Sequence, residues 1–111
     1  MNYDPHNEKV VARARSVPDE KWNELPVESL SAGTPLEANE KTLKQKSIDK
    51  VVSGAEPFRA GYVTKLWRDK NGRVHVVDGH HRVAMYHVLG KAMPVRIMDE
   101  SAYDRLVGRR N

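Results

Sequence analysis

The stretch HVVDGHHRVAMYHVLGK, residues 75–91, decides the fold because its periodicity changes in the middle. The residues before Gly79 form a β-type run. After Gly79, four residues recur at helical spacing and would form one side of a helix, namely Val83, Ala84, His87 and Val88. Gly90 then stands where a glycine commonly ends a helix in the left-handed conformation. The stretch therefore predicts a strand that turns through DGHHR, residues 78–82, into a helix.

The strand that enters DGHHR is predicted to be the second half of a hairpin. Two β-type runs, 61–67 and 73–77, are separated by a linker that contains Asn71 and Gly72. Both residues of this pair accept the positive φ of a tight turn, so Asn-Gly between β-formers is a strong hairpin signal.

The flanking segments extend this pattern on both sides. ELPVESL, residues 24–30, alternates and contains a proline, which predicts a short edge strand. Apolar spacing predicts an amphipathic helix over about 41–53, with Gly54 as its stop. PVRIM, residues 94–98, predicts a last strand. The order strand, helix, hairpin, helix, strand predicts an α+β domain with a small mixed β-sheet and packed helices.

The domain is expected to span residues 22–98, and a chain of 111 residues has the length of one small domain. Residues 1–21 mix charge with isolated apolar positions and are expected to form a partly ordered arm. The apolar positions of the arm fit one face of a short helix, made by Val10, Val11 and Ala14. Residues 99–111 are expected to form a basic tail that adds a helical turn.

Composition narrows the classes of function. The chain has no Cys, which excludes disulfides, thiolate nucleophiles and thiolate metal sites. A net charge of +4 favours polyanionic partners without requiring one. No apolar run approaches the roughly 20 residues needed to cross a bilayer, and the amino terminus lacks the layout of a secretory signal. We therefore expect a cytoplasmic protein with no membrane partner.

The DGHHR corner has the properties of an anion site. The first turn of a helix presents free backbone N–H groups and the positive end of the helix dipole. Gly79 allows a ligand to approach the backbone closely. Arg82 can make a bidentate contact to phosphate, and His80 and His81 add hydrogen-bond donors. Two roles are open for Asp78. It can cap the helix, which is favoured for Asp78 taken by itself, or it can hold a magnesium ion or act as a base beside a bound phosphate.

Other chemistries fit these residues less well. A zinc site is not expected, because adjacent His80 and His81 diverge by about 100° around a helix, whereas short zinc motifs place His at i and i+4. A serine triad is not expected either, since the chain has no G-x-S-x-G element. His75 is expected to be a half-exposed sheet residue. Packing is expected of the remaining candidates, which are His87, Tyr62 and Trp67.

Together these segments resemble the ParB/sulfiredoxin-like superfamily, often labelled the ParB-like nuclease domain. The resemblance covers about residues 22–98 and rests on LPVESL, on SIDKVVSGAEPF and most specifically on VHVVDGHHRVAMYHVLGKAMPVRI. It implies a small α+β fold in which four residues bind nucleotide phosphates, namely Gly79, His80, His81 and Arg82. In segregation proteins of this superfamily the corresponding stretch reads GERR and serves CTP. In sulfiredoxins it reads GCHR and serves ATP.

The resemblance also implies catalytic candidates. The DGHxR variant is similar to that of relatives with kinase, ATPase or nuclease activity, which implies catalytic roles for Asp78 and His80. Glu28, in LPVESL, lies where some relatives place a functional acid. The implied cofactor is a nucleoside triphosphate with Mg²⁺, for which Asp78 is the candidate metal ligand.

The chain also departs from the sequence pattern of this superfamily. His80 stands where sulfiredoxins have their cysteine, so reduction of a sulfinic acid is excluded. The helix-turn-helix region of the segregation proteins does not follow the last predicted strand, so a full partition protein is not expected.

Two functions therefore stay open. The first is a nucleotide- or phosphate-binding domain that hydrolyses NTPs or nucleic-acid phosphodiesters. The second is a non-catalytic module of a phage or mobile element that binds DNA through its basic surface, or binds a host protein. The second is suggested because the motif contains one convincing acid, whereas metal-dependent phosphoryl transfer usually uses two or more carboxylates.

Overall fold

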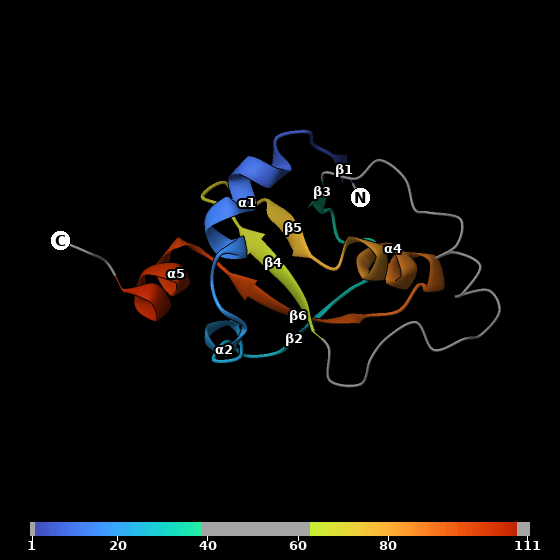
Figure 1. Ribbon diagram of the computed structural model, residues 1–111. Coiled ribbons are helices and arrows are strands. Elements are labelled where there is room, and N and C mark those ends of the chain that lie inside the picture. Colours follow the sequence, from blue (N-terminus) through green and yellow to red (C-terminus); the bar gives the residue numbers. More distant parts are fainter. Residues whose placement is uncertain (1, 39–62, 109–111) are drawn as a thin grey trace.

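The computed structural model, described for residues 2–38 and 63–108, forms a mixed sheet with helices on both faces (Figure 1). The strands are β1 (Asn2–Tyr3), β2 (Glu28–Leu30), β3 (Glu37–Ala38), β4 (Thr64–Arg68), β5 (Val74–Asp78) and β6 (Met93–Met98). The helices are α1 (Asn7–Arg15), α2 (Asp19–Trp22), α4 (His80–Leu89) and α5 (Glu100–Val107). The predicted α+β class is confirmed. The helix predicted over 41–53 lies outside the described residues.

The six strands follow the order β1-β3-β5-β4-β6-β2. β4 lies in the middle, antiparallel to β5 and parallel to β6. β2 pairs antiparallel with β6 at the end of the sheet, which confirms the predicted edge strand. The strand begins at Glu28, after Pro26, because a proline has no N–H to donate to the sheet.

The predicted hairpin is confirmed, but its turn differs from the expected one. The carbonyl of Asp69 accepts from the N–H of Gly72 at 3.0 Å, and the Asp69 carboxylate accepts from the N–H groups of Asn71 at 2.8 Å and Arg73 at 3.0 Å. Gly72 has φ 81°. Among the described residues, every residue with a positive φ is a glycine. Gly72 alone, and not Asn71 with it, therefore takes the left-handed conformation.

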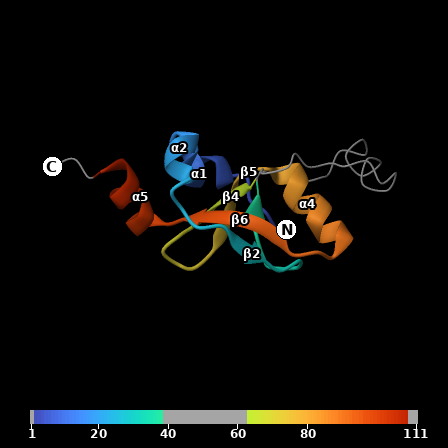
Figure 2. The ribbon, with the colours of Figure 1, turned by 90° about the horizontal axis from the view of Figure 1, so that it is seen from below.

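The sheet has an apolar core on each face. The α1 face is covered by α1, α2 and α5, and Figure 2 shows α1 and α2 together on one side of the strands. Its buried residues are Val11, Ala14, Val17, Trp22, Leu25, Trp67, Val77, Met98 and Ala102. The α4 face is covered by α4. Its buried residues are Leu36, Ala38, Leu66, Val76, Val83, Met93 and Val95.

Both terminal segments take part in this packing. Within residues 1–21, expected to be an arm outside the domain, α1 lies against β5 and fully buries Val11 and Ala14. The indole N–H of Trp22 donates to the carbonyl of Ala14 at 3.2 Å, which ties α2 to α1. Within residues 99–111, expected to be a tail, α5 forms two turns and Ala102 is buried. The hydrophobic core therefore includes residues on both sides of the predicted 22–98 domain.

Helix α4 begins and ends as predicted. It ends at Gly90, which has φ 65°, and the N–H groups of Gly90 and Lys91 donate to the carbonyls of His87 and Tyr86. Val83 is buried and Tyr86 packs against the same core. His87 is exposed, so its predicted packing is wrong. It lies in the last turn of α4, where Leu89 and Gly90 are exposed as well.

Candidate functional site

The DGHHR corner forms the predicted strand-to-helix turn. Asp78 is the exposed last residue of β5, and α4 begins at His80. The residue between them, Gly79, is the N-cap of the helix, with φ 93° and no side-chain cap. The usual helix cap is made by the side chain of the N-cap residue, and Asp78 lies one position earlier. Asp78 was favoured from sequence as the helix cap, but it does not occupy the N-cap position of α4.

The residues expected to bind phosphate follow directly. His80 and His81 form the first turn of α4, and Arg82, which follows them, is half-buried. Among the side chains that the structure describes, no group of three or more His, Asp or Glu residues is arranged to hold a metal ion.

A β-bulge brings Asp78 onto the α1 face of the sheet. Lys65 pairs with Asp78, while the next residue, Leu66, pairs with Val76, so the register skips Val77. In a bulge two residues of one strand oppose one residue of its neighbour. Regular alternation would place Val77 and Asp78 on opposite faces, but here both line one hollow beside Lys65. The bulge therefore decides which face receives the carboxylate.

The same row continues into β6. Lys65 is the direct partner of Arg96 across the parallel pair β4–β6. Side chains of directly paired residues lie on the same face of a sheet. Asp78, Lys65 and Arg96 thus form a charged row across three neighbouring strands. Two like charges directly opposite one another destabilise a sheet, so the Lys65–Arg96 pair favours the presence of an anion nearby.

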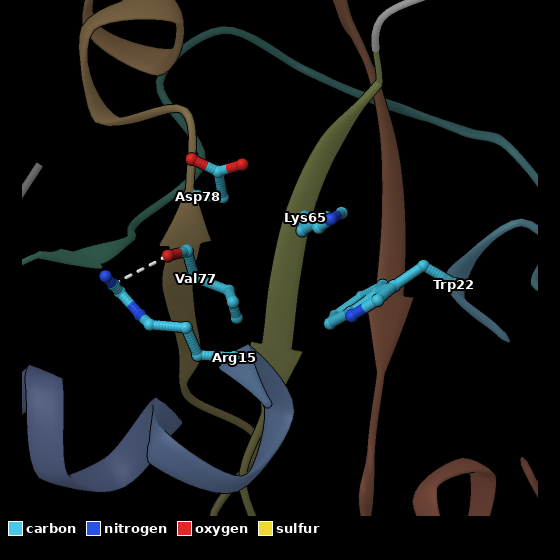
Figure 3. Close-up of a pocket in the computed structure, with 5 residues that line it drawn as sticks. All are labelled: Arg15, Trp22, Lys65, Val77 and Asp78. Atoms are coloured by element: carbon cyan, nitrogen blue, oxygen red, sulfur yellow. Dashed lines mark hydrogen bonds between the residues drawn. The ribbon is translucent and has the colours of Figure 1, made fainter. Parts of the chain in front are cut away.

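The row is the floor of an open pocket beneath α1 and α2. One hollow, of about 160 Å³, is lined by Arg15, Trp22, Lys65, Val77 and Asp78 (Figure 3). A second, of about 240 Å³, shares Trp22, Lys65 and Asp78 with the first. Its other lining residues are Asp19, Asn23, Val63 and Arg96. We call the two hollows together the row pocket.

Backbone carbonyls hold the two arginines at the pocket. The Nη2 of Arg15 donates to the carbonyl of Val77 at 2.8 Å, as drawn in Figure 3, and lies 3.0 Å from a Glu8 carboxylate oxygen. The Nε of Arg96 donates to the carbonyl of Leu25 at 3.0 Å. Each guanidinium is therefore oriented by the fold before any ligand arrives.

Lys65 lies between an aromatic ring and a carboxylate. Its Nζ is 5.7 Å from the centroid of the Trp22 ring, within the range of a cation–π contact. The same ammonium contacts the carboxylate of Asp19, and this hydrogen bond lowers the pKa of Asp19 below its ordinary value. The Lys65 side chain is 20% exposed, whereas that of Asp19 is 82% exposed. The cation is thus largely enclosed and its carboxylate partner is at the surface.

Glu28 does not join this group. It is exposed on β2, where it pairs with Val95. Two strands, β4 and β6, separate β2 from β5. Three strand spacings put Glu28 roughly 14 Å from Asp78. The structure does not bring these two predicted catalytic acids together.

The sequence interpretation missed the cations of the pocket. Arg15, Lys65 and Arg96 were not among its candidates, although Lys65 and Arg96 each lie within a predicted β-type run, 61–67 and 94–98. A cation in the middle of each of these predicted β-type runs was the available signal. The bulge that adds Asp78 to the row has no such signal in the sequence.

His75 lies in a separate buried network, and its predicted half-exposure is wrong. It is 3% exposed, with Nδ1 2.9 Å from Oδ1 of Asn7 and Nε2 2.8 Å from Oδ2 of Asp69. Asn7 also donates from Nδ2 to the carbonyl of Val76 at 3.0 Å, which turns its Oδ1 toward the imidazole. The network ties the start of α1 to the hairpin. It lies in the interior and lines neither hollow of the pocket.

The same network affects the pKa of Asp69. Partial burial raises the pKa of its carboxyl, but the hydrogen bonds from His75 and from the N–H groups of Arg73 and Asn71 together lower it more. The net result is a pKa below the ordinary value for Asp. Trp67 is buried in the core, as predicted, and Tyr62 lies outside the described residues.

Comparison with known proteins adds no relative. No protein-family model matches the chain, and a search of curated proteins found no similar sequence. In the part of the chain that the structure describes, no helix has the length and apolar character needed to span a membrane. Fold and site together define an α+β domain with a charged pocket on the α1 face of its central sheet, beneath α1 and α2.

Proposed function

We infer that the protein binds a phosphate-bearing ligand, and specifically a nucleotide, in the row pocket. The observation that carries this proposal is the direct pairing of Lys65 with Arg96 on two interior strands, under the cover of α1 and α2. Like charges in such positions repel, and an anion between them turns the repulsion into attraction.

The donors fit phosphate oxygens. Arg96 uses Nε to hold the carbonyl of Leu25. Among the described residues, no acceptor contacts its two terminal nitrogens, so these can donate to a phosphate. Lys65 adds a point charge, and its partial enclosure strengthens the attraction because the local dielectric is lower than that of water.

The resemblance to the ParB/sulfiredoxin-like superfamily supports the same position. It assigns nucleotide phosphates to the turn at Gly79 and to the start of α4, with His80, His81 and Arg82. Asp78 belongs to both that motif and the charged row. The proposal therefore joins the helix start and the row pocket into one site, with a nucleoside triphosphate as its ligand.

A Mg²⁺ ion fits this proposal as a companion of the ligand. Magnesium in nucleotide sites is commonly held by one or two carboxylates together with phosphate oxygens and water. Asp78 would supply the carboxylate. In the enzymatic form of the proposal, Asp78 and His80 also move protons during hydrolysis of an NTP or a phosphodiester.

Binding without turnover is the alternative, and the position of Glu28 favours it. With Glu28 three strand spacings from Asp78 and Asp19 paired to Lys65, Asp78 is the one acid of the predicted catalytic set at the pocket. Metal-dependent phosphoryl transfer usually needs more carboxylates than this. In this form the protein is a non-catalytic module, and its partner is DNA or a host protein.

The test compares thermal stability with and without ligands. ATP, CTP, inorganic phosphate and a DNA duplex are added to the wild type and to Lys65→Met and Lys70→Met. Lys70 is the matched control, because it is an exposed lysine in the hairpin turn. A ligand at a hundred times its Kd stabilises the native state by about 2.7 kcal/mol. We expect a nucleotide to raise the Tm of the wild type and Lys70→Met by several degrees, and that of Lys65→Met far less.

The outcomes separate the functions. The enzymatic form is supported if the wild type releases phosphate from ATP and the variants Asp78→Ala and His80→Ala do not. Stabilisation by a nucleotide without turnover supports the binding module. No stabilisation by any nucleotide or phosphate refutes the nucleotide proposal. Salt-sensitive binding of the DNA duplex in that case points to nucleic acid.

A further inference from the structure

We propose that Asp19 is a built-in competitor for the anion of the row pocket: its carboxylate holds Lys65 in the free protein and yields it to the phosphate of the ligand. This inference rests on the proposed function and adds to it. It makes Asp19, on α2, a residue that sets the affinity of the pocket for anions.

The position of Asp19 carries the argument. It is the first residue of α2 and lines the larger hollow together with Arg96 and Asp78. Its carboxylate contacts the ammonium of Lys65, the central member of the charged row. A carboxylate oxygen therefore already lies where a phosphate oxygen would bind.

The contact between Asp19 and Lys65 is also easily broken. The Asp19 side chain is 82% exposed, and Lys65 is its one polar partner among the described residues. When the carboxylate swings away it returns to water, so its release leaves no buried charge behind. Exposed ion pairs are weak, which makes this competition modest in size.

Lys65 cannot leave the pocket in the same way. Its side chain is 20% exposed, and it lies over Trp22, which is itself buried. Without Asp19, the ammonium would face Arg96 with Asp78 as the remaining acid of the row. The internal carboxylate thus stabilises the free protein against charge repulsion, and the ligand takes over this role.

The experiment measures anion affinity in two matched variants. Asp19→Asn removes the competing charge with little change of shape. Glu20→Gln removes the same charge from the next residue of the same helical turn, which lines neither hollow. Calorimetric titrations use ATP and inorganic sulfate, which keeps its double charge over a wide pH range. We expect Asp19→Asn to bind both about two- to fivefold more tightly than the wild type, and Glu20→Gln to match the wild type.

A second measurement follows the carboxylate itself. The ¹³C signal of the Asp19 carboxyl is titrated with acid by NMR, with and without sulfate. Lys65 lowers the pKa of Asp19 in the free protein, so release of Lys65 to sulfate raises that pKa toward its ordinary value. In Lys65→Met, the pKa of Asp19 is expected to be ordinary already and to change little with sulfate.

The results distinguish the two proposals. Anion binding in the wild type with no gain in Asp19→Asn, or with an Asp19 pKa that sulfate leaves unchanged, overturns the competitor role and leaves the binding site intact. Absence of ATP and sulfate binding in both the wild type and Asp19→Asn overturns the binding site and the competitor together.

Discussion

Replacing Asn7 with alanine is expected to destabilise the protein by about 2–6 kcal/mol, even though Asn7 lies in the first turn of α1, near the amino terminus. The Asn7 side chain is fully buried and serves two groups of β5. It donates to the carbonyl of Val76 at 3.0 Å and lies 2.9 Å from Nδ1 of His75. Alanine leaves both buried groups without this partner, at about 1–3 kcal/mol each. The sum is a large share of the 5–15 kcal/mol typical of a folded domain.

Urea unfolding followed by tryptophan fluorescence measures this loss, since Trp22 and Trp67 are both buried and become exposed on unfolding. Asn23→Ala is the control: it removes the same amide from an exposed position and is expected to change stability by less than about 0.5 kcal/mol. A loss below about 1 kcal/mol for Asn7→Ala, with an unchanged m-value, would show that the network does not stabilise the fold as argued.

Three further outcomes are expected. The pKa of Asp69 is lowered in the folded protein, so its contribution to stability is present above about pH 4 and is lost as the pH falls through the lower folded-state value. Urea unfolding at pH 7 and pH 3 should therefore show Asp69→Asn less stable than the wild type at pH 7 and closer to it at pH 3; equal differences at both would contradict this. Gly79→Ala should lose about 1–2 kcal/mol, because Gly79 has φ 93°, and thermal unfolding tests it. Arg96→Lys keeps the charge but loses the bond from Nε to Leu25, and calorimetry should show roughly three- to tenfold weaker ATP binding; unchanged affinity would remove Arg96 from the site.

Local signals in the sequence determined much of the fold. The change of period at Gly79, the turn around Gly72 and the stop at Gly90 lie within a few residues of the structures they specify, and the hairpin and α4 were predicted from them. Such features depend on backbone conformation and on neighbours in the chain. The same is true of the edge strand, where Pro26 stands just outside β2.

The candidate site was predicted only in part, because half of it comes from remote segments. Asp78 and Gly79 belong to a contiguous motif that the sequence shows directly. Lys65 and Arg96 come from separate strands, and they meet because β4 and β6 pair in parallel in one particular register. A shift by one residue would turn either side chain to the other face of the sheet.

The sequence by itself determined the hairpin, the edge strand β2 and the two ends of α4, since these follow from residues close together in the chain. Only the tertiary structure decided which side chains share a face. The bulge at Val77 turns Asp78 toward Lys65, and the packing of α1 on β5 buries His75 against Asn7. The bulge depends on the exact pairing of the two hairpin strands, and the burial of His75 depends on a contact between residues 68 positions apart, and no local pattern in the sequence records either.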